Sequence, residues 1–334
     1  MRVYITGAAG FIGFHLAKLL LDEGHAVRGH DGMTDYYDLR LKEGRLAQLT
    51  QQPGFTFHRG MLEDVGDLAV DIKGFSPEVI VHLGAQAGVR YSLEAPRSYL
   101  SSNIDGTFNV LEAARDAGVR HLLHAPKYRV IRANTQMPYR ETDKADTQVS
   151  LYAATKKATE AISHSWAHLY GLPVTAFRFF TVYGPWGRPD MAPWKFTRAI
   201  LAGETIDVYG QGEMFRDFTY VTDLVRAIRL LIDVPPLRQD WPVEEGDSLS
   251  PVAPWRVVNI GNGEKVSLGD FIAAIEAAAG KKAVRRMMEM QQGDVRATWA
   301  DTTLLRRLTG YAPQTGIGEG MARFVDWYRG YAGA

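Results

Sequence analysis

Apolar residues along the first 180 positions form short continuous runs that alternate with longer stretches of helical spacing. The runs predict buried strands at residues 2–5, 26–29, 56–58, 79–83, 121–124 and 174–179. Helical spacing, with apolar residues three or four positions apart, covers residues 11–23, 98–117 and 150–170. Strands that alternate with helices are typical of a parallel sheet covered on both faces. The pattern therefore predicts an α/β fold with a doubly wound parallel sheet.

The alternation loosens after about residue 185, where proline and tryptophan become frequent. Residues 235–254 are expected to form a loop, followed by a strand at 257–260 and a helix at 267–279. We expect two domains. Residues 1–180 would form the first, and residues 181–334 would form mainly a smaller C-terminal α/β lobe for the substrate, with later segments returning to the first domain.

A glycine-rich turn, ITGAAGFIG, joins the first expected strand to the first helix and predicts a dinucleotide site of the Rossmann type. Gly7, Gly10 and Gly13 would let the backbone approach a pyrophosphate. The start of the helix, which includes Phe11 and Ile12, supplies unpaired N–H groups and a positive dipole end. The spacing GxxGxxG is a weak signal alone, but its place after an N-terminal strand strengthens it.

Asp31 ends the second expected strand, 18 residues after the last glycine of that turn. An acidic side chain at this place accepts a hydrogen bond from a ribose hydroxyl and repels a 2′-phosphate. We therefore expect NAD rather than NADP as the cofactor. The alternative interpretation is that Asp31 is an ordinary turn residue in front of Gly32.

Tyr152 and Lys156, in the run SLYAATKKATE, are the strongest catalytic candidates. Residues four apart on a helix share one face. A lysine ammonium there favours the tyrosinate over the phenol, whose pKa is ordinarily about 10. Such a pair makes a general base for a sugar or alcohol hydroxyl. With a dinucleotide site in the same chain, it predicts hydride transfer at an alcohol carbon.

Charge and composition exclude several classes of protein. Lys plus Arg and Asp plus Glu each number 38, so the formal net charge is zero and nothing indicates a nucleic-acid-binding face. There is no cysteine, which excludes disulfides, thiolate catalysis and cysteine-ligated metals. The sequence shows no signal peptide and no apolar run near the ~20 residues of a membrane span. We expect a cytoplasmic protein that binds neither nucleic acid nor a membrane.

Six segments downstream of the glycine turn carry a family resemblance. They are HLGAQAGVRYS at 82–92, SLYAATKKATE at 150–160, FRFFTVYGPWGRPDM at 177–191, GQGEMFRDFTYVTD at 210–223, NIGN at 259–262 and MQQGDV at 290–295. In their order and spacing they resemble the extended short-chain dehydrogenase/reductase family, and within it the UDP-glucuronate 4-epimerases. The resemblance covers nearly the whole chain.

The resemblance implies a reaction on UDP-glucuronate. NAD would take a hydride from C4 while Tyr152 takes the hydroxyl proton, and return of the hydride to the opposite face would give UDP-galacturonate. The 4-keto intermediate is a β-keto acid, which loses CO2 when the breaking bond aligns with the carbonyl. Arg188 offers a planar fork that would hold the carboxylate out of alignment, and Thr181 offers a hydroxyl. The resemblance places both at the C5–C6 end of the sugar.

The same resemblance assigns the residues that would bind the nucleotide end of the substrate. Arg216 would pair with the diphosphate and Asp294 with the uridine ribose. Arg90, Tyr91 and Ser92 would line the path between sugar and phosphate. Each of these could instead be an ordinary structural residue.

Two positions depart from the family pattern. A serine/threonine run is expected after the strand at 121–124, with one hydroxyl bonded to the C4 oxygen, and Lys127 falls at that position in the block PKYRVIR at 126–132. Lys127 or Tyr128 replaces the missing donor, or the loop is displaced and turnover is impaired, or a compensated reading-frame slip altered the recorded gene. Met61 stands where relatives carry an aspartate near the adenine, and Leu62 remains to pack on that ring.

The resemblance favours a UDP-glucuronate 4-epimerase, and two other interpretations stay open. One is a 4-epimerase of a neutral UDP-hexose. The other, which rests on the altered block at 126–132, is a catalytically impaired protein that binds NAD and a UDP-sugar. A related decarboxylase would carry a glutamate between His124 and Asn134, and none is present.

The family also implies a homodimer, with the helices at 98–117 and 150–170 as candidates for the interface. The histidines show no metal-ligand spacing, so no metal is expected.

Overall fold

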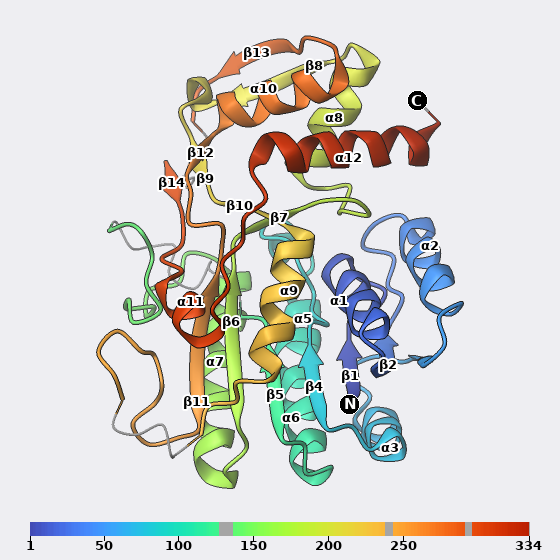
Figure 1. The fold of residues 1–334 in the computed structure, drawn as a ribbon, viewed down its shortest axis with the longest axis vertical. Coiled ribbons are helices and arrows are strands. Elements are labelled where there is room, and N and C mark those ends of the chain that lie inside the picture. The colour runs from blue at the N-terminus through green and yellow to red at the C-terminus, as the bar shows by residue number, and fades with distance from the viewer. Residues whose placement is uncertain (127–135, 238–242, 291–295, 334) are drawn as a thin grey trace.

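The structure is a computed structural model that describes residues 1–126, 136–237, 243–290 and 296–333. A seven-stranded sheet in the order β11-β6-β5-β4-β1-β2-β3 forms its centre (Figure 1). Its strands are β1 (Arg2–Thr6), β2 (Ala26–Asp31), β3 (Phe55–Arg59), β4 (Val79–His82), β5 (His121–His124), β6 (Val174–Phe179) and β11 (Trp255–Ile260). Every neighbouring pair runs parallel. The predicted doubly wound sheet of the Rossmann type is confirmed.

Helices cover both faces of this sheet, as a parallel sheet requires. One face packs against α1 (Phe11–Asp22), α2 (Leu39–Leu49), α9 (Val221–Ile232) and α11 (Thr303–Thr309). The other face packs against α3 (Val65–Phe75), α6 (Gly106–Asp116) and α7 (Leu151–Tyr170). The strands β1, β4 and β6 are therefore buried along nearly their whole length, which explains why they read as continuous apolar runs, whereas the edge strand β3 is only partly buried.

A smaller group of elements lies beyond the carboxyl ends of β1 and β4, at the top of Figure 1. Its strands are β7 (Thr181–Tyr183), β8 (Thr205–Tyr209), β9 (Phe215–Arg216), β10 (Phe218–Tyr220), β12 (Val266–Ser267), β13 (Val284–Met288) and β14 (Ala297–Thr298). Its helices are α8 (Ala192–Ala202), the 3₁₀ turn η3 (Gly210–Gly212), α10 (Leu268–Ala279) and α12 (Ile317–Ala332). The helices α8, α10 and α12 share a separate apolar core with β8 and β10.

The apolar pattern located all seven strands of the central sheet, but it did not identify α2, α3, α8, α9 or α12. The helix expected at 98–117 is also divided. The short helices α4 (Tyr91–Glu94) and α5 (Pro96–Tyr99) come first, then a π-helical turn, η1 (Leu100–Asp105), and then α6. Such turns are frequent at functional sites. No helix in the described parts of the chain is long and apolar enough to cross a membrane.

A buried polar network fixes the segment that leads into α7. Glu160 of α7 accepts two hydrogen bonds from Arg178 of β6, at 2.8 and 2.9 Å. Arg178 also donates to the carbonyl of Glu141, and the Glu141 carboxylate accepts from the backbone N–H of Asn259 at 2.8 Å. These bonds join the approach to α7 to β6 and β11, and so they set the position from which the Tyr152 helix begins.

Glu141 predicts a pH-dependent effect on stability. Burial raises the pKa of this carboxyl from 4.5 to about 7, although the Asn259 N–H opposes the rise. Between these values the unfolded chain loses a proton that the folded chain keeps, so the free energy of unfolding falls as pH rises. We expect Glu141→Gln, which keeps an acceptor and removes the charge, to be more stable than the parent by about 2 kcal/mol at pH 8.

Urea denaturation at pH 5 and pH 8 measures this effect, since the gain should shrink towards pH 5. Glu94→Gln, at an exposed position, is the matched control and should change stability little at either pH. A gain of equal size at both pH values would contradict the assignment.

Candidate active site

An open cleft lies at the carboxyl ends of β1, β2 and β4, where the order of the sheet reverses between β1 and β4. It encloses about 1370 Å³ of empty space, part of it open to solvent. Ligands of doubly wound folds bind at this kind of switch point. Ten of the predicted cofactor, catalytic and substrate residues line the cleft, namely Gly7, Gly10, Phe11, Ile12, Gly13, Asp31, Leu62, Tyr152, Lys156 and Arg188, and so does Met61.

The glycine turn leaves no room for side chains. A Cβ atom on Gly13 would lie 2.1 Å from the carbonyl oxygen of Gly7, and one on Gly10 would lie 2.9 Å from the same atom. Gly7 itself has φ of +71°, and its N–H donates to the carbonyl of His30 at 2.7 Å. Gly10 caps α1 without a side-chain hydrogen bond. The first N–H groups of α1 have no partner within the helix, so the turn and the helix start fit a pyrophosphate.

Asp31 lies at the end of β2 and is already held by the backbone. Its two carboxylate oxygens accept from the N–H groups of Ala9 and Met33, at 3.1 and 2.8 Å. Lys42 of α2 is also buried and lies 3.5 Å from Asp31 Oδ1, with a further bond to Thr34 at 3.2 Å. The sequence did not single out Lys42. A carboxylate and an ammonium thus share the place where the second ribose of a dinucleotide is expected.

This pair makes the cofactor preference testable. In Asp31→Asn the repulsive charge is lost while the Lys42 ammonium remains, so we expect affinity for NAD to fall and affinity for NADP to rise. Each change should be ~10-fold or more, the usual range for a hydrogen bond to a charged group. Calorimetric titration of both dinucleotides measures the ratio. Adding Lys42→Gln should remove the gain for NADP, and a gain that survives would show that Lys42 does not face the 2′-position.

Tyr152 and Lys156 lie one turn apart near the start of α7, and both are buried. The helix begins at Ser150, whose hydroxyl accepts from the Ala153 N–H at 3.1 Å. Burial lowers the pKa of the Lys156 ammonium from 10.5 to about 8. Among the described residues, no acidic side chain pairs with this ammonium. Lys156 is therefore a buried cation whose natural partner is an anion formed in the cleft.

Asn103 and Tyr99 pack beside this pair, although neither lines the cleft itself. The Asn103 amide, fully buried in the π-helical turn, bonds the backbone of Gln86 through both its oxygen and its nitrogen, and also donates to Thr155 of α7 at 3.1 Å. The Tyr99 ring meets the Tyr152 ring edge to face, with centroids 5.8 Å apart. The turn thus ties the loop after β4 to the helix that carries Tyr152.

Arg188 reaches the cleft from the loop after β7, but its guanidinium already forms hydrogen bonds in the free protein. Nε and Nη2 donate to the two oxygens of Asp190, at 3.0 and 2.6 Å. The guanidinium also lies over the ring of Tyr36, 5.5 Å from its centroid. Burial opposes the charge on Arg188, but Asp190 more than offsets it and raises the pKa of the guanidinium. Arg188 was predicted from the sequence to hold the sugar carboxylate, but Asp190 and Tyr36 were not expected beside it.

Other residues predicted for the substrate lie elsewhere. Arg90, Tyr91, Ser92, Thr181 and Arg216 do not line the cleft in the described parts of the chain. The Ser92 hydroxyl donates to the carbonyl of Val89 at 2.6 Å, and an Arg216 N–H donates to the carbonyl of Phe215 at 2.8 Å. Lys127 and Asp294 lie outside the described residues. The roles of all seven stay predictions.

Comparison with known proteins agrees with this geometry. The model described as the NAD dependent epimerase/dehydratase family matches residues 3–239. A probable UDP-glucuronate 4-epimerase of Rhizobium meliloti (strain 1021) is 52% identical over 330 residues, covering 98% of this chain and 97% of that protein.

Two solved structures have the same fold. One is the UDP-glucuronic acid 4-epimerase from Bacillus cereus in complex with UDP-glucuronic acid and NAD, with a TM-score of 0.86 at 28% identity over 99% of this chain and 100% of that chain. The other is the UDP-glucose 4-epimerase of Thermotoga maritima with UDP-glucose, with a TM-score of 0.83 at 27% identity and the same coverage. Since the family model spans most of this chain and the Rhizobium protein matches nearly all of it, the chain belongs to the NAD dependent epimerase/dehydratase family.

Proposed function

We propose that this protein is a UDP-glucuronate 4-epimerase, which interconverts UDP-glucuronate and UDP-galacturonate by inverting C4 with NAD as cofactor. The observation that carries this function is the convergence of the Tyr152–Lys156 pair, the glycine turn and Arg188 on one cleft. The 52% identity to the probable UDP-glucuronate 4-epimerase of Rhizobium meliloti supports the same substrate. NAD would be held by the glycine turn, the start of α1, Asp31 and Leu62.

When bound, NAD supplies the acceptor and donor of hydride at C4. Tyr152 takes the C4 hydroxyl proton and returns it to the opposite stereoisomer. The ammonium of Lys156 lies on the same helix face and stabilises the negative charge on the tyrosine oxygen. Because the site is buried and no described carboxylate pairs with Lys156, this interaction is stronger than it would be in water. Asn103 acts as a positioning residue, since it fixes α7 through Thr155.

Arg188 would hold the sugar carboxylate. The oxidised sugar is a β-keto acid, and its loss of CO2 needs the C5–C6 bond to align with the carbonyl at C4. A cation that binds the carboxylate in one plane keeps the bond out of that alignment. We also assign Thr181 to this end of the sugar, with support from the resemblance alone.

The nucleotide end of the substrate is assigned on the same basis. Arg216, carried by β9 of the C-terminal lobe, is proposed for the diphosphate, and Asp294 for the uridine ribose. Arg90, Tyr91 and Ser92 are proposed for the path between them. We keep the division into residues 1–180 and 181–334 as a proposal, with α9, α11 and β11 returning to the cofactor domain.

A conversion assay tests the function. We expect the purified chain to convert UDP-glucuronate to UDP-galacturonate, followed by NMR of the sugar protons, and Tyr152→Phe to lower the rate ~10²–10⁴-fold, the usual cost of losing a positioned proton-transfer group. Binding of UDP-glucuronate without any conversion, in protein from a verified gene, would contradict the proposal and favour the impaired homologue.

Two experiments distinguish the explanations for the altered block at 126–132. Sequencing the coding DNA shows whether a reading-frame slip occurred, and substituting Lys127 distinguishes the other two explanations. If the lysine replaces the missing hydroxyl donor, Lys127→Ser lowers turnover; if the block only impairs catalysis, restoring serine raises turnover. A lysine close to Lys156 must be neutral or turned away, because two ammonium groups repel each other.

The runner-up substrate is a neutral UDP-hexose, which the likeness to the Thermotoga maritima UDP-glucose 4-epimerase supports. The charged Arg188 in the cleft favours the uronic acid, since a hydroxymethyl group gains little from an arginine fork. Comparing kcat/KM for UDP-glucuronate and UDP-glucose decides between them, and a preference for UDP-glucose would overturn the assignment.

We further propose a homodimer that forms through the helices at 98–117 and 150–170. Exposed apolar side chains on these segments support it, among them Leu100, Leu169 and Tyr170. Sedimentation equilibrium measures the mass in solution, and a monomer at micromolar concentration would contradict it. The cytoplasmic location stays a proposal as well.

A further inference from the structure

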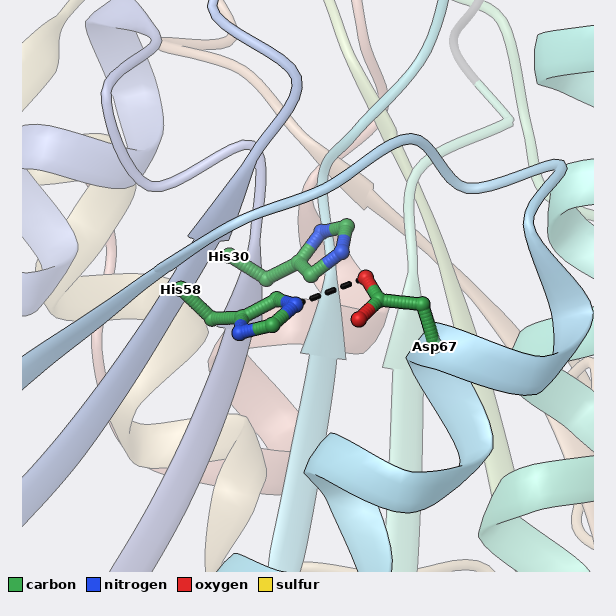
Figure 2. Close-up of side chains that lie close together, drawn as sticks. All are labelled: His30, His58 and Asp67. Atoms are coloured by element: carbon green, nitrogen blue, oxygen red, sulfur yellow. Dashed lines mark hydrogen bonds and ion pairs between the residues drawn. The ribbon is translucent and has the colours of Figure 1, made fainter.

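Two histidines and an aspartate converge at the edge of the central sheet, beside the cofactor cleft. His30 of β2 and His58 of β3 are direct partners in the parallel register, so their side chains point to the same face. Their rings stack with centroids 5.6 Å apart and planes inclined by 19°. Asp67, in the first turn of α3, lies against both rings (Figure 2), and its Oδ2 is 2.7 Å from His58 Nε2. One ligand atom from each residue lies within 4.8 Å of the others.

His30 is the unusual member of this cluster. Its side chain is 1% exposed, and neither ring nitrogen has a hydrogen-bond partner among the described residues. Buried side-chain nitrogens nearly always have a partner, because an unpaired polar group in the interior is costly. The neighbouring His58–Asp67 pair is satisfied without it. An imidazole held in this way points to a ligand that the protein itself does not supply.

The backbone of Gly60 packs closely against all three members of the cluster. A Cβ atom on Gly60 would lie 2.4 Å from Asp67 Oδ2 and 2.9 Å from His30 Nε2. The φ angle of Gly60 is not in the left-handed region, so its conformation alone does not call for glycine. Glycine fits here because any side chain at this position would displace the carboxylate of Asp67 or the imidazole of His30, and so separate two of the three candidate ligands.

The outer contacts of the cluster also suit a metal site. Asp71 Oδ1 lies 3.6 Å from His58 Nδ1, on the side of the ring away from Asp67. Asp71 is itself held by Tyr4, whose hydroxyl donates at 2.7 Å, and by Arg28 Nε at 3.1 Å. A histidine that binds a metal through one nitrogen commonly presents the other to a carboxylate, which orients the ring.

We propose that His30 Nε2, His58 Nε2 and the Asp67 carboxylate bind one zinc ion, with water in the fourth position. Two imidazoles and one carboxylate are ligands that zinc accepts in a tetrahedral site. Zinc bonds of ~2.0–2.2 Å place ligand atoms about 3.4 Å apart, so His58 Nε2 and Asp67 Oδ2, which lie 2.7 Å apart, would separate slightly to admit the ion. The fold brings together what the spacing of the histidines in the sequence did not indicate.

The position of this site defines its role. It would join β2, β3 and α3, the outermost elements on this edge of the sheet. His30 and Leu62 both line the cleft, and Asp31 follows His30 directly. The ion is therefore structural: it would hold the end of β2 and the turn after β3 in the arrangement that receives the adenosine half of the cofactor.

Zinc binding to the full chain, without a histidine tag and with NAD present, tests the proposal. After removal of metals by a chelator, calorimetric titration with Zn²⁺ should give one site per chain. His58→Gln and Asp67→Asn should each weaken binding at least ~10–100-fold, since each removes a ligand and loss of even an outer-contact residue has that effect. Gly60→Ala should weaken it as well, although all three ligands remain. His168→Gln, an exposed histidine far along the chain, is the matched control and should bind as the parent does.

Melting temperatures provide a second measurement of zinc binding, in case one of the variants fails to fold. The side chain of Asp67 is 38% exposed, so Asp67→Asn should fold, and its melting temperature without zinc should match that of the parent. Zinc should raise the melting temperature of the parent and of His168→Gln but not of Asp67→Asn. No zinc uptake by the parent would overturn the proposal, and so would equal affinity in the parent, Asp67→Asn and His58→Gln.

Discussion

Replacing Lys156 by methionine is expected to lower turnover ~10²–10⁴-fold and, at the same time, to make the cofactor-free protein more stable at pH 7. Most point substitutions destabilise a protein, typically by ~0.5–3 kcal/mol. In Lys156→Met, turnover should fall while stability rises, because the ammonium is buried without a described carboxylate partner. Methionine has a similar length, is apolar and fills irregular space well.

The stability gain follows from the pKa of the lysine. Burial lowers this pKa from 10.5 to about 8, so between these values the unfolded chain binds a proton that the folded chain does not. The free energy of unfolding of the parent therefore rises with pH over this window, and below pH 8 the full cost of the buried charge is present. That cost is about 3 kcal/mol, and Lys156→Met removes it.

Urea denaturation at pH 7 and pH 9.5, together with the conversion assay, measures both effects. The gain of Lys156→Met should be largest at pH 7 and smaller at pH 9.5. Lys18→Met, at an exposed helical lysine whose side chain is 49% accessible, is the control and should affect neither turnover nor the pH dependence of stability. A variant that loses turnover and also loses stability at pH 7 would show that Lys156 has a partner in the folded protein.

The parts of the fold that the sequence predicted are those decided by local pattern. Strands such as β1, β4 and β6 are buried along nearly their whole length, so each is an apolar run that needs no knowledge of its neighbours, whereas the edge strand β3 is only partly buried. The helix α2 was missed because its sequence, LRLKEGRLAQL, buries Lys42 and Arg45, which a polar–apolar pattern assigns to the surface. Arg45 is buried because it donates to the carbonyls of Ala9 and Trp186, a contact between distant segments.

The same distinction applies to the candidate site. The glycine turn and the Tyr152–Lys156 pair are encoded within a few residues, so their spacing is visible in the sequence. The His30–His58 contact depends on the register of two strands joined by a long connection, and no spacing rule gives that register. Lys42 beside Asp31 depends on where α2 packs. Residues that act through tertiary contact were therefore missed, whereas those that act through one turn of helix or one loop were found.

Arg188→Leu is expected to lower kcat/KM for UDP-glucuronate ~10²–10³-fold, since each hydrogen bond between a guanidinium and a carboxylate is worth about 1.5–3 kcal/mol. Turnover of UDP-glucose should fall much less. We also expect release of CO2 and a UDP-ketopentose from the variant, because the β-keto acid is no longer held out of alignment. Trapping of CO2 from labelled substrate measures that release, and its absence at a measurable rate of oxidation would contradict the clamp.

Asp190 decides which edge of Arg188 is available to the substrate. In the free protein Asp190 occupies the edge formed by Nε and Nη2. If the sugar carboxylate used this edge, Asp190 would compete with it, and Asp190→Asn would tighten binding of UDP-glucuronate. If the carboxylate uses the edge that includes Nη1, Asp190 instead fixes the guanidinium in place, and the same substitution weakens binding.

We expect the second result, a loss of ~10-fold in affinity for UDP-glucuronate in Asp190→Asn, with little change for UDP-glucose. The bidentate pair with Asp190 removes the freedom of a long side chain before the substrate arrives, so less conformational entropy is lost on binding. Stacking on Tyr36 supports the same orientation. Calorimetric titration of both UDP-sugars into a Tyr152→Phe background, in which turnover is suppressed, measures the difference. Tighter binding of UDP-glucuronate by Asp190→Asn would show that Asp190 competes for the clamp rather than positions it.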